Sequence, residues 1–486
     1  MALAAVNFAN GVVGAGIVGL PFAFNQMGLP LGVVSCVLVA TCSQYTIRLL
    51  AELGSAHGLS NYLDLAQRAF GAPGYYLCSL FQGAFAFGAM VTYLIIFADT
   101  MPDVLMGDGP SDDKKMLELR RIVLAVAGVL VLLPLSLIRS FGSLARLGLF
   151  KMFATLFLAV MACTYAVIIP RTDNASEYTF ACKYTSVHRD YFPALGTIAF
   201  AFVCHHQTFL VQGSLKNPTP RRFAITTSLA IFGSFSLSLA VAVAGYVTFF
   251  ESIKGDLFTS YSTLKKDGNF PSPDVLTTAR LLLALNMIIT YPGELMVARQ
   301  TIESILSRVR KTQRWKATMD TNTSATSSGM SGGSPSMPPS SMPSSSTFDV
   351  AKLAESRALE EVQSAMAADT WAFGTPIPPS IKEHVLITTG LFLASLTIGL
   401  LVQDISTVLN LTGSTAAVFL SFLFPAAIRI RLGADANDSE KWYSIRNFFP
   451  ILVLVFGTVA FVASSGISVV NLALGASSVA NESKQC

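Results

Sequence analysis

The chain has 486 residues, of which 52% are hydrophobic and only 13% are charged. Soluble proteins carry roughly 25% charged residues, so lipid must be the solvent for most of this chain. The net charge is +4 and the basic residues form no long block, which argues against nucleic-acid binding. The seven cysteines form no C-x-x-C pair, so we expect no cofactor and no metal site beyond a coupling ion.

A membrane-spanning helix needs about 20 predominantly apolar residues. This criterion predicts an all-α membrane protein of about eleven transmembrane helices. The first apolar stretch is too long for a cleaved signal peptide, so we expect it to remain as helix 1. The predicted helices lie at 3–27, 29–51, 75–101, 121–138, 148–170, 191–213, 222–250, 274–306, 383–402, 408–430 and 447–474.

Two segments are predicted not to span the membrane. Residues 52–74 are amphipathic and are expected at the membrane surface. Residues 307–381 form an insert between helices 1–8 (1–306) and helices 9–11 (382–475). The insert holds a Ser/Pro/Met-rich tract at 321–347 that is too poor in apolar residues to fold and a short helical patch at 349–366. Residues 476–486 form a C-terminal tail.

The distribution of Lys and Arg indicates the orientation. Basic residues in the short loops after helices 6 and 10 favour a cytoplasmic N-terminus: Lys216, Arg221, Arg222, Arg429, Arg431, Lys441 and Arg446. The insert would then be cytoplasmic and the C-terminal tail would face outward. Asn174 begins an Asn-x-Ser glycosylation pattern in a predicted outer loop.

Helix 1 contains four glycines between Gly11 and Gly19, followed by Pro21. Each glycine costs about 1 kcal/mol of helix propensity relative to alanine. Small residues can serve close packing between helices. The alternative is a discontinuous helix at Gly14-Ala15-Gly16, whose free amides and carbonyls hold a carboxylate or a small cation. Exposed backbone is not tolerated in lipid, so such a break must line a site.

Helix 6 carries Cys204, His205, His206 and Gln207 in an otherwise apolar run. Such side chains are costly in lipid and need partners or a water-filled cavity. A satisfied hydrogen bond between helices explains either histidine equally well. Helices 1 and 6 correspond in inverted-repeat transporters, and both break near the membrane centre. We therefore predict two inverted five-helix repeats, helices 1–5 and 6–10, with helix 11 additional.

Helix 8 offers further oxygen atoms near its middle. Met287 and Thr290 lie one turn apart and can face one cation through a carbonyl and a hydroxyl. The alternative is a proline-relaxed helix in which Thr290 bonds to a preceding carbonyl. Glu294 lies five residues from Arg299 and is interpreted as a paired acid near the cytoplasmic interface rather than a proton carrier.

Three stretches of the chain resemble the amino acid/auxin permease superfamily, and within it the sodium-coupled neutral amino acid transporters. They are Asn10-x-x-x-Gly14-x-Gly16-Ile17-x-Gly19-Leu20-Pro21, Phe202-Val203-Cys204-His205 with Ser214 to Arg222, and Thr290-Tyr291-Pro292. The resemblance covers nearly the whole chain except 307–381. It implies alternating access and an amino acid bound at the breaks of helices 1 and 6.

The resemblance also implies roles for individual residues. Gly14, Ala15 and Gly16 would offer amides to the substrate carboxylate. Cys204 and His205 would lie beside its amino group and side chain. The residues that match the family's cation site are Asn10, Val13, Met287 and Thr290.

The chain departs from the family pattern in two places. His206 stands where the sodium-coupled members often have proline, a difference that bears on the substrate range. Those members also carry a tail before helix 1, so we hypothesise that this sequence lacks an N-terminal segment; a mature N-terminus at Met1 or Ala2 would exclude this.

The predicted function is secondary active transport of an amino acid by symport, with neutral amino acids as the favoured substrates. Asn10 and Thr290 favour Na+, but proton-driven vacuolar relatives resemble helix 1 too, so the coupling ion is Na+ or H+. The alternative is an amino-acid-sensing receptor that transports little. No hydrolase or protease motif indicates a membrane enzyme. The expected partners are an amino acid and the lipid bilayer, in the plasma membrane or a vacuolar or lysosomal membrane; the oligomeric state stays open.

Overall fold

The computed structural model describes residues 2–106, 113–138, 147–169, 191–215, 219–266, 272–328, 380–436 and 447–473. The glycosylation candidate Asn174, the helical patch at 349–366 and the tail at 476–486 lie outside these ranges. The chain divides into two compact units. The first comprises Met1–Thr301 with Val385–Cys486, and the second comprises Ile302–His384.

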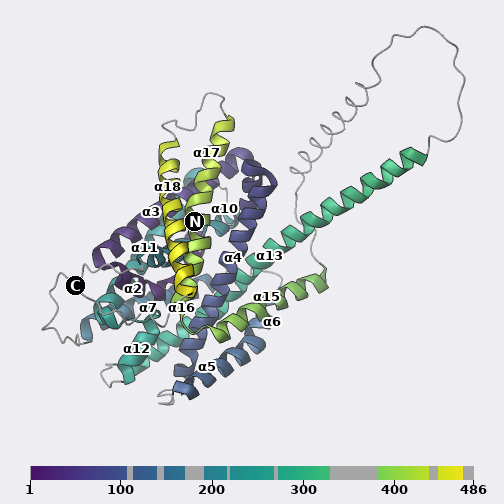
Figure 1. Cartoon of the computed structure of the whole chain (residues 1–486). Helices are drawn as coiled ribbons and strands as arrows, with labels where there is room; N and C mark the ends of the chain where they lie inside the picture. The colour runs from purple at the N-terminus through teal and green to yellow at the C-terminus, as the bar shows by residue number, and fades with distance from the viewer. Residues whose placement is uncertain are drawn as a thin grey trace, which may run out of the picture. The chain divides into compact units, whose positions relative to one another are not determined.

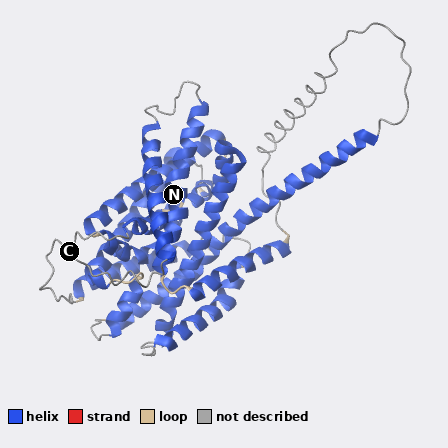
Figure 2. Ribbon diagram, viewed as in Figure 1, coloured by secondary structure: helices blue, strands red, loops and turns tan. Residues whose placement is uncertain are grey.

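Every regular element in the described ranges is a helix (Figure 2). Figure 1 follows them from purple at the N-terminus to yellow near the C-terminus. The α-helices are α1 (Ala2–Val12), α2 (Gly16–Met27), α3 (Leu29–His57), α4 (Tyr62–Met106), α5 (Asp113–Ala127), α6 (Leu133–Ser136), α7 (Gly148–Ile168), α9 (Tyr191–Phe202), α10 (Thr208–Ser214), α11 (Pro220–Phe249), α12 (Leu257–Lys266), α13 (Pro273–Ser328), α15 (Ile381–Leu401), α16 (Ile405–Thr412), α17 (Phe424–Ala436) and α18 (Phe448–Ala473). Short 3₁₀ or π segments are η1 (Gly128–Leu132), η3 (His205–Gln207), η4 (Phe250–Ser252), η5 (Gly413–Ala417) and η6 (Phe419–Leu423).

All eleven predicted spans fall on helical segments. Among the described residues, nine helices are long and apolar enough to cross a membrane, or ten when the bent pair α1–α2 counts as one span. The predicted span at 121–138 is not among them. It is formed by α5, the π-helical η1 and α6.

Several boundaries differ from those predicted. Helix α3 continues to His57, and Gly58 ends it in the left-handed conformation with a φ of 66°. The predicted surface stretch 52–74 is largely helical, and Gly71, with a φ of 67°, kinks α4 between Tyr62 and its membrane-crossing part. Helix α13 continues to Ser328, well beyond the predicted end at residue 306. The tract at 321–347 therefore begins inside α13, and its remainder lies outside the described ranges.

The centre of the first unit is formed by α2 and α9, which pack against each other. Almost every residue of α2 and nearly all of α9 are buried. Helix α11 packs on α1, α2, α3 and α7, while η5, α16 and α18 cover α9. The large apolar side chains exposed on outer helices, such as Val167 and Leu386 at 86% and 74%, form a surface suited to lipid.

The last helix, α18, closes one side of this centre. It packs on α9, η5, η6 and α17, and Figure 1 shows α17 and α18 running beside each other. Ser464 donates a hydrogen bond to the carbonyl oxygen of Phe192 at 2.7 Å, and the hydroxyls of Ser414 and Ser468 are 3.3 Å apart. Helix 11 therefore contributes polar contacts to helix 6 as well as lipid-facing surface.

The second unit contains the continuation of α13 and the first residues of α15. Arg310 and Glu383 form an ion pair of 2.7 Å, with side chains 51% and 33% exposed. Solvent screens ion pairs at the protein surface, so this pair adds little stability.

Candidate functional site

The first predicted break is present between α1 and α2, whose axes differ by 47°. Gly14 donates its amide to the Val12 carbonyl oxygen at 2.9 Å, a tight turn that replaces the helical bond. Helix α2 then begins at Gly16, and its N-cap residue Ala15 provides no side-chain cap. The amides of a helix's first turn lack partners within the helix and favour an anion. Binding of a carboxylate at this break stays a prediction.

The second predicted break is present in helix 6. Helix α9 ends at Phe202, and Cys204 adopts φ and ψ angles of −141° and 19° before the 3₁₀ turn η3. Cys204 and His205 are fully buried. The Nε2 atom of His205 lies 2.8 Å from the Thr46 hydroxyl of α3. The hydrogen bond between helices that we considered for a histidine is therefore made, while Nδ1 of His205 has no hydrogen-bond partner.

The two breaks lie side by side. A Cβ atom built on Gly16 would lie 2.7 Å from both Cα and Cβ of Ala201 in α9. A Cβ atom on Gly11 would overlap the Gln207 side chain that follows the second break, and one on Gly14 would lie 3.1 Å from the Tyr93 hydroxyl. Glycines in helix 1 thus permit the close approach, which brings predicted substrate residues of both helices to one region.

The predicted cation ligands lie on α1, on the break that follows it, and on α13. Asn10 donates its amide to the Gly148 carbonyl oxygen at 2.6 Å, which leaves its own carbonyl oxygen available. Thr290 donates its hydroxyl to the Asn286 carbonyl oxygen at 2.8 Å, as the alternative interpretation expected. Val13 and Met287 are buried. Among the described residues, no hydrogen bond joins Asn10 or Val13 to Met287 or Thr290.

The neighbours of Glu294 were not predicted from the sequence. Glu294 is only 5% exposed and lies beside the second break. Its Oε2 atom is 3.6 Å from Nε2 of His206, and Gln207 donates to its Oε1 atom at 3.3 Å. Arg299 donates a hydrogen bond to the Thr388 hydroxyl at 3.1 Å. The signal available in the sequence was the cost of an acid and a histidine in apolar helices.

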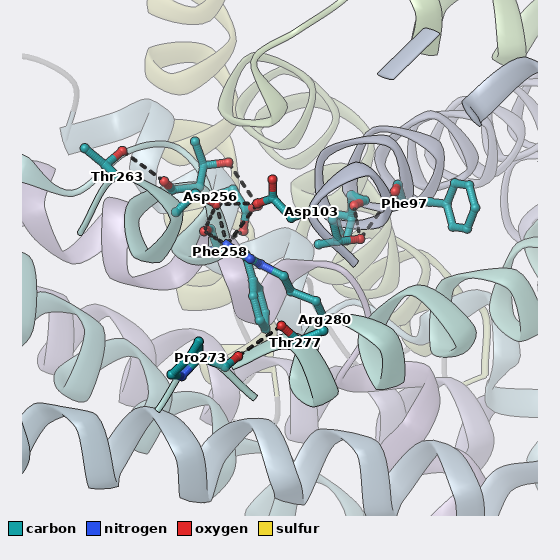
Figure 3. A network of polar contacts seen from close by, with 12 residues as sticks. Phe97, Asp103, Asp256, Phe258, Thr263, Pro273, Thr277 and Arg280 are labelled. Atoms are coloured by element: carbon teal, nitrogen blue, oxygen red, sulfur yellow. Dashed lines mark hydrogen bonds and ion pairs between the residues drawn. The ribbon is translucent and has the colours of Figure 1, made fainter. Parts of the chain in front are cut away.

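A second polar network joins α4, α12 and α13 (Figure 3). Arg280 is 1% exposed and forms an ion pair of 3.0 Å with Asp103. Its guanidinium also reaches Ser262 and the Phe258 carbonyl oxygen of α12. Asp256 caps α12 by accepting the Phe258 amide at 3.1 Å. Burial raises the pKa of Asp256 to about 6. The hydrogen bonds that its carboxylate accepts and the positive charge of Arg280 lower the pKa, but by less than burial raises it.

Residues 1–470 match the family described as "Transmembrane amino acid transporter protein". The chain belongs to this family. The predicted family resemblance is thereby confirmed, and this member is a multi-pass membrane transporter rather than an enzyme.

The relatives of this family member carry related names. A Danio rerio protein named sodium-coupled neutral amino acid transporter 11, which bears its name provisionally, is 29% identical over 93% of this chain and 83% of its own length. The Mus musculus protein of the same provisional name is 34% identical over 62% of this chain and 64% of its own. Vacuolar amino acid transporter 2 of Saccharomyces cerevisiae is 28% identical over 63% of this chain and 62% of its own length.

Among solved structures, a mutant of the manganese transporter of Eremococcus coleocola matches with a TM-score of 0.51 and 11% identity, over 97% of this chain and 93% of its own. At this identity the likeness concerns the fold alone. It agrees with the predicted all-helical transporter architecture, while the inverted-repeat relation between helices 1–5 and 6–10 stays a prediction.

Proposed function

We propose that this family member carries a neutral amino acid across the membrane by alternating access, together with Na+. The observation that supports this most is the meeting of two helix breaks at Gly16 and Ala201. Uncapped amides of α2 would hold the substrate carboxylate, and the buried Cys204 and His205 would lie beside the amino group. The names of the zebrafish and mouse relatives support an amino acid substrate and Na+ as the cation.

The cation would bind oxygen atoms of Asn10, Val13, Met287 and Thr290. Hard cations prefer such carbonyl and hydroxyl ligands. A cation there would order the backbone around Gly14, which the substrate also contacts. Each ligand would then raise the affinity for the other by the same factor.

Uptake by reconstituted proteoliposomes tests this function. We expect uptake of at least one labelled neutral amino acid to depend on an inward Na+ gradient and to fall in choline buffer. Measurement at two pH values separates Na+ from H+ as the driving ion. Substrate binding without flux would instead favour a sensing receptor, and flux independent of any cation gradient would contradict symport.

The Thr290→Ala substitution tests the cation ligands. It removes one oxygen, and a loss of about 1.4 kcal/mol would raise the half-saturating Na+ concentration roughly tenfold. Thr278→Ala is the matched control, because Thr278 lies on the exposed face of the same helix and bonds to the Asp274 carbonyl oxygen in the same way. An unchanged Na+ requirement in Thr290→Ala would remove Thr290 from the site.

A further inference from the structure

A cavity opens at one end of the first unit between α3, α10 and α11. Its open space is about 250 Å³, which is several times the volume of about 30 Å³ that a water molecule occupies. The residues that line it are Arg48, Ala51, Glu52, Ser55, Gln212, Pro220, Phe223 and Ala224. None of them belongs to the predicted substrate or cation site, so the cavity is separate from the site of the proposed symport.

The position of the cavity along its helices places it at the level of lipid headgroups. Arg48, Glu52 and Ser55 follow one another on α3 at intervals of four and three residues, so they share one face of that helix. They lie around residue 51, where the predicted span ends. Helix α11 begins at Pro220, two residues before its predicted span. Both helices therefore meet the cavity where the hydrocarbon core ends.

Arg48 presents a fixed positive charge to the cavity. Its Nη2 atom donates to the Ser228 hydroxyl and, at 3.4 Å, to the Ala224 carbonyl oxygen. Its Nε atom lies 2.6 Å from the Gln44 carbonyl oxygen, in the amide orientation that pairs both ends of Gln44. These bonds hold the guanidinium in place and leave Nη1 without a partner among the described residues. A planar guanidinium with a free N–H edge is suited to a phosphate or a carboxylate.

Glu52 and Gln212 provide acceptors beside this cation. Glu52 is exposed and makes no hydrogen bond or ion pair within the described ranges. Gln212 donates its amide to the Ser55 hydroxyl at 3.0 Å, which leaves the Gln212 carbonyl oxygen as an acceptor and the Ser55 hydrogen as a donor. The carboxylate disfavours a ligand with several negative charges. The donor and acceptor set instead matches a zwitterion, with an anionic group on Arg48 and an ammonium group on Glu52.

An apolar stripe runs along α11 from the cavity. Ile225, Leu229 and Phe232 follow Ala224 at helical spacing and are 42%, 60% and 71% exposed. Leu210 of α10 is 58% exposed as well. Such side chains face hydrocarbon, where acyl chains can lie against them. A free amino acid carries the same two charges but has no chains that would use this stripe, so the stripe favours a zwitterionic lipid.

We propose that this cavity binds the headgroup of phosphatidylethanolamine. The phosphate accepts hydrogen bonds from Arg48 and Ser55, and the ammonium group donates to Glu52 and Gln212. With the N-terminus in the cytosol, as predicted, the lipid belongs to the cytoplasmic leaflet. The headgroup connects α3 to α10, which is the part of helix 6 that follows the second break. Binding of this lipid does not depend on the proposed symport, because no residue is shared.

Thermal unfolding of the purified protein in detergent, titrated with dioctanoyl lipids, tests the proposal. We expect phosphatidylethanolamine to raise the melting temperature saturably. Phosphatidylcholine, whose quaternary ammonium group has no N–H to donate, and phosphatidylglycerol, which has no ammonium group, should each need about tenfold higher concentrations. Glu52→Gln should remove the difference between the first two lipids, and Arg48→Gln should weaken both. Glu118→Gln and Arg121→Gln, at exposed positions of α5, should behave like the wild type.

Mass spectrometry of the intact protein, which counts the retained lipids, provides a second measurement. Ser55→Ala replaces Arg48→Gln if that variant does not fold, and should also retain less phosphatidylethanolamine. Equal stabilisation by the three lipids, or wild-type binding of phosphatidylethanolamine by both the Glu52 variant and the second variant, would overturn the proposal. Saturable stabilisation by free alanine that Glu52→Gln abolishes would assign the cavity to a soluble zwitterion and overturn the lipid.

Discussion

At the scale of single residues, Gly16 shows how little space separates the two broken helices. A methyl group there would lie 2.7 Å from backbone and side-chain carbon atoms of Ala201, and no rotamer change can move a backbone atom away. Overpacking of this kind costs about 1–3 kcal/mol. We expect Gly16→Ala to lower the melting temperature and to abolish uptake, because α2 and α9 must separate.

Gly233 is the matched control for this prediction. It lies within α11 with nothing near its missing Cβ atom, so Gly233→Ala should retain uptake and gain up to about 1 kcal/mol of helix propensity. Equal effects of the two substitutions on thermal unfolding and uptake would show that the crossing does not depend on glycine.

The breaks at Gly14 and Cys204 were predictable because glycines and polar side chains in an apolar helix are locally costly. The environment of Glu294 was not. Sequence spacing placed Arg299 as its nearest basic residue, five positions away. Its observed neighbours His206 and Gln207 come from another helix, and only the tertiary packing of α13 against the second break could reveal them.

At the scale of elements, hydrogen bonds of Arg120 connect α5 to two other helices. Its Nε atom donates to Asp99 of α4 at 2.5 Å, and its terminal nitrogens donate to the carbonyl oxygens of Gly399 and Val402 at the end of α15. Arg120→Ala should destabilise the protein by up to about 3 kcal/mol, because Asp99, whose side chain is only 14% exposed, would lose its basic partner. Thermal unfolding in detergent measures this. The exposed neighbour Arg121 gives the control Arg121→Ala, and a similar loss in both would refute a specific bridge.

The cap of α12 gives a pH-dependent prediction. The folded protein raises the pKa of Asp256 from 3.8 to about 6 by burial, so the native state binds the extra proton. The associated stability, ~3 kcal/mol, is fully present below pH 4 and is lost as the pH rises through about 6. Asparagine keeps the cap but does not titrate.

We therefore expect the melting temperature of the wild type to fall relative to that of Asp256→Asn between pH 4 and pH 7. Asp274→Asn is the control, since Asp274 is exposed in the first turn of α13. Parallel melting curves for wild type and Asp256→Asn across this range would show that Asp256 does not titrate as described.

The elements themselves were largely predictable, because apolar length decides where helices cross a membrane. Their π-helical interruptions were not predictable. The π segment η1 divides the predicted span at 121–138, and η5 and η6 lie within the predicted span at 408–430. Such irregularities depend on packing between helices, as at Gly413, whose missing Cβ position is filled by the Gly196 carbonyl of α9. The short helix α12 lies between the predicted spans 222–250 and 274–306. A search for long apolar stretches does not detect a helix this short.

At the scale of the whole molecule, the family and the all-helical transporter fold were predictable from motifs and hydropathy. The observed helices follow one another in the predicted order. The network of Arg280 was missed because Asp103 and Asp256 were assigned to separate predicted loops, which folding brings together at the ends of α4 and α12. Loop residues carry no periodic signal that would indicate such a partner.

The packing of α18 on α9 has a consequence for biosynthesis. Ser464, which bonds to the carbonyl oxygen of Phe192, is translated 272 residues after it. At 5–20 residues per second, this delay is on the order of half a minute. During that time the nascent helix 6 sits in the membrane without its last neighbour, with both histidines already inserted. Messages truncated before residue 448 should therefore yield a product that the cell's quality control retains and degrades.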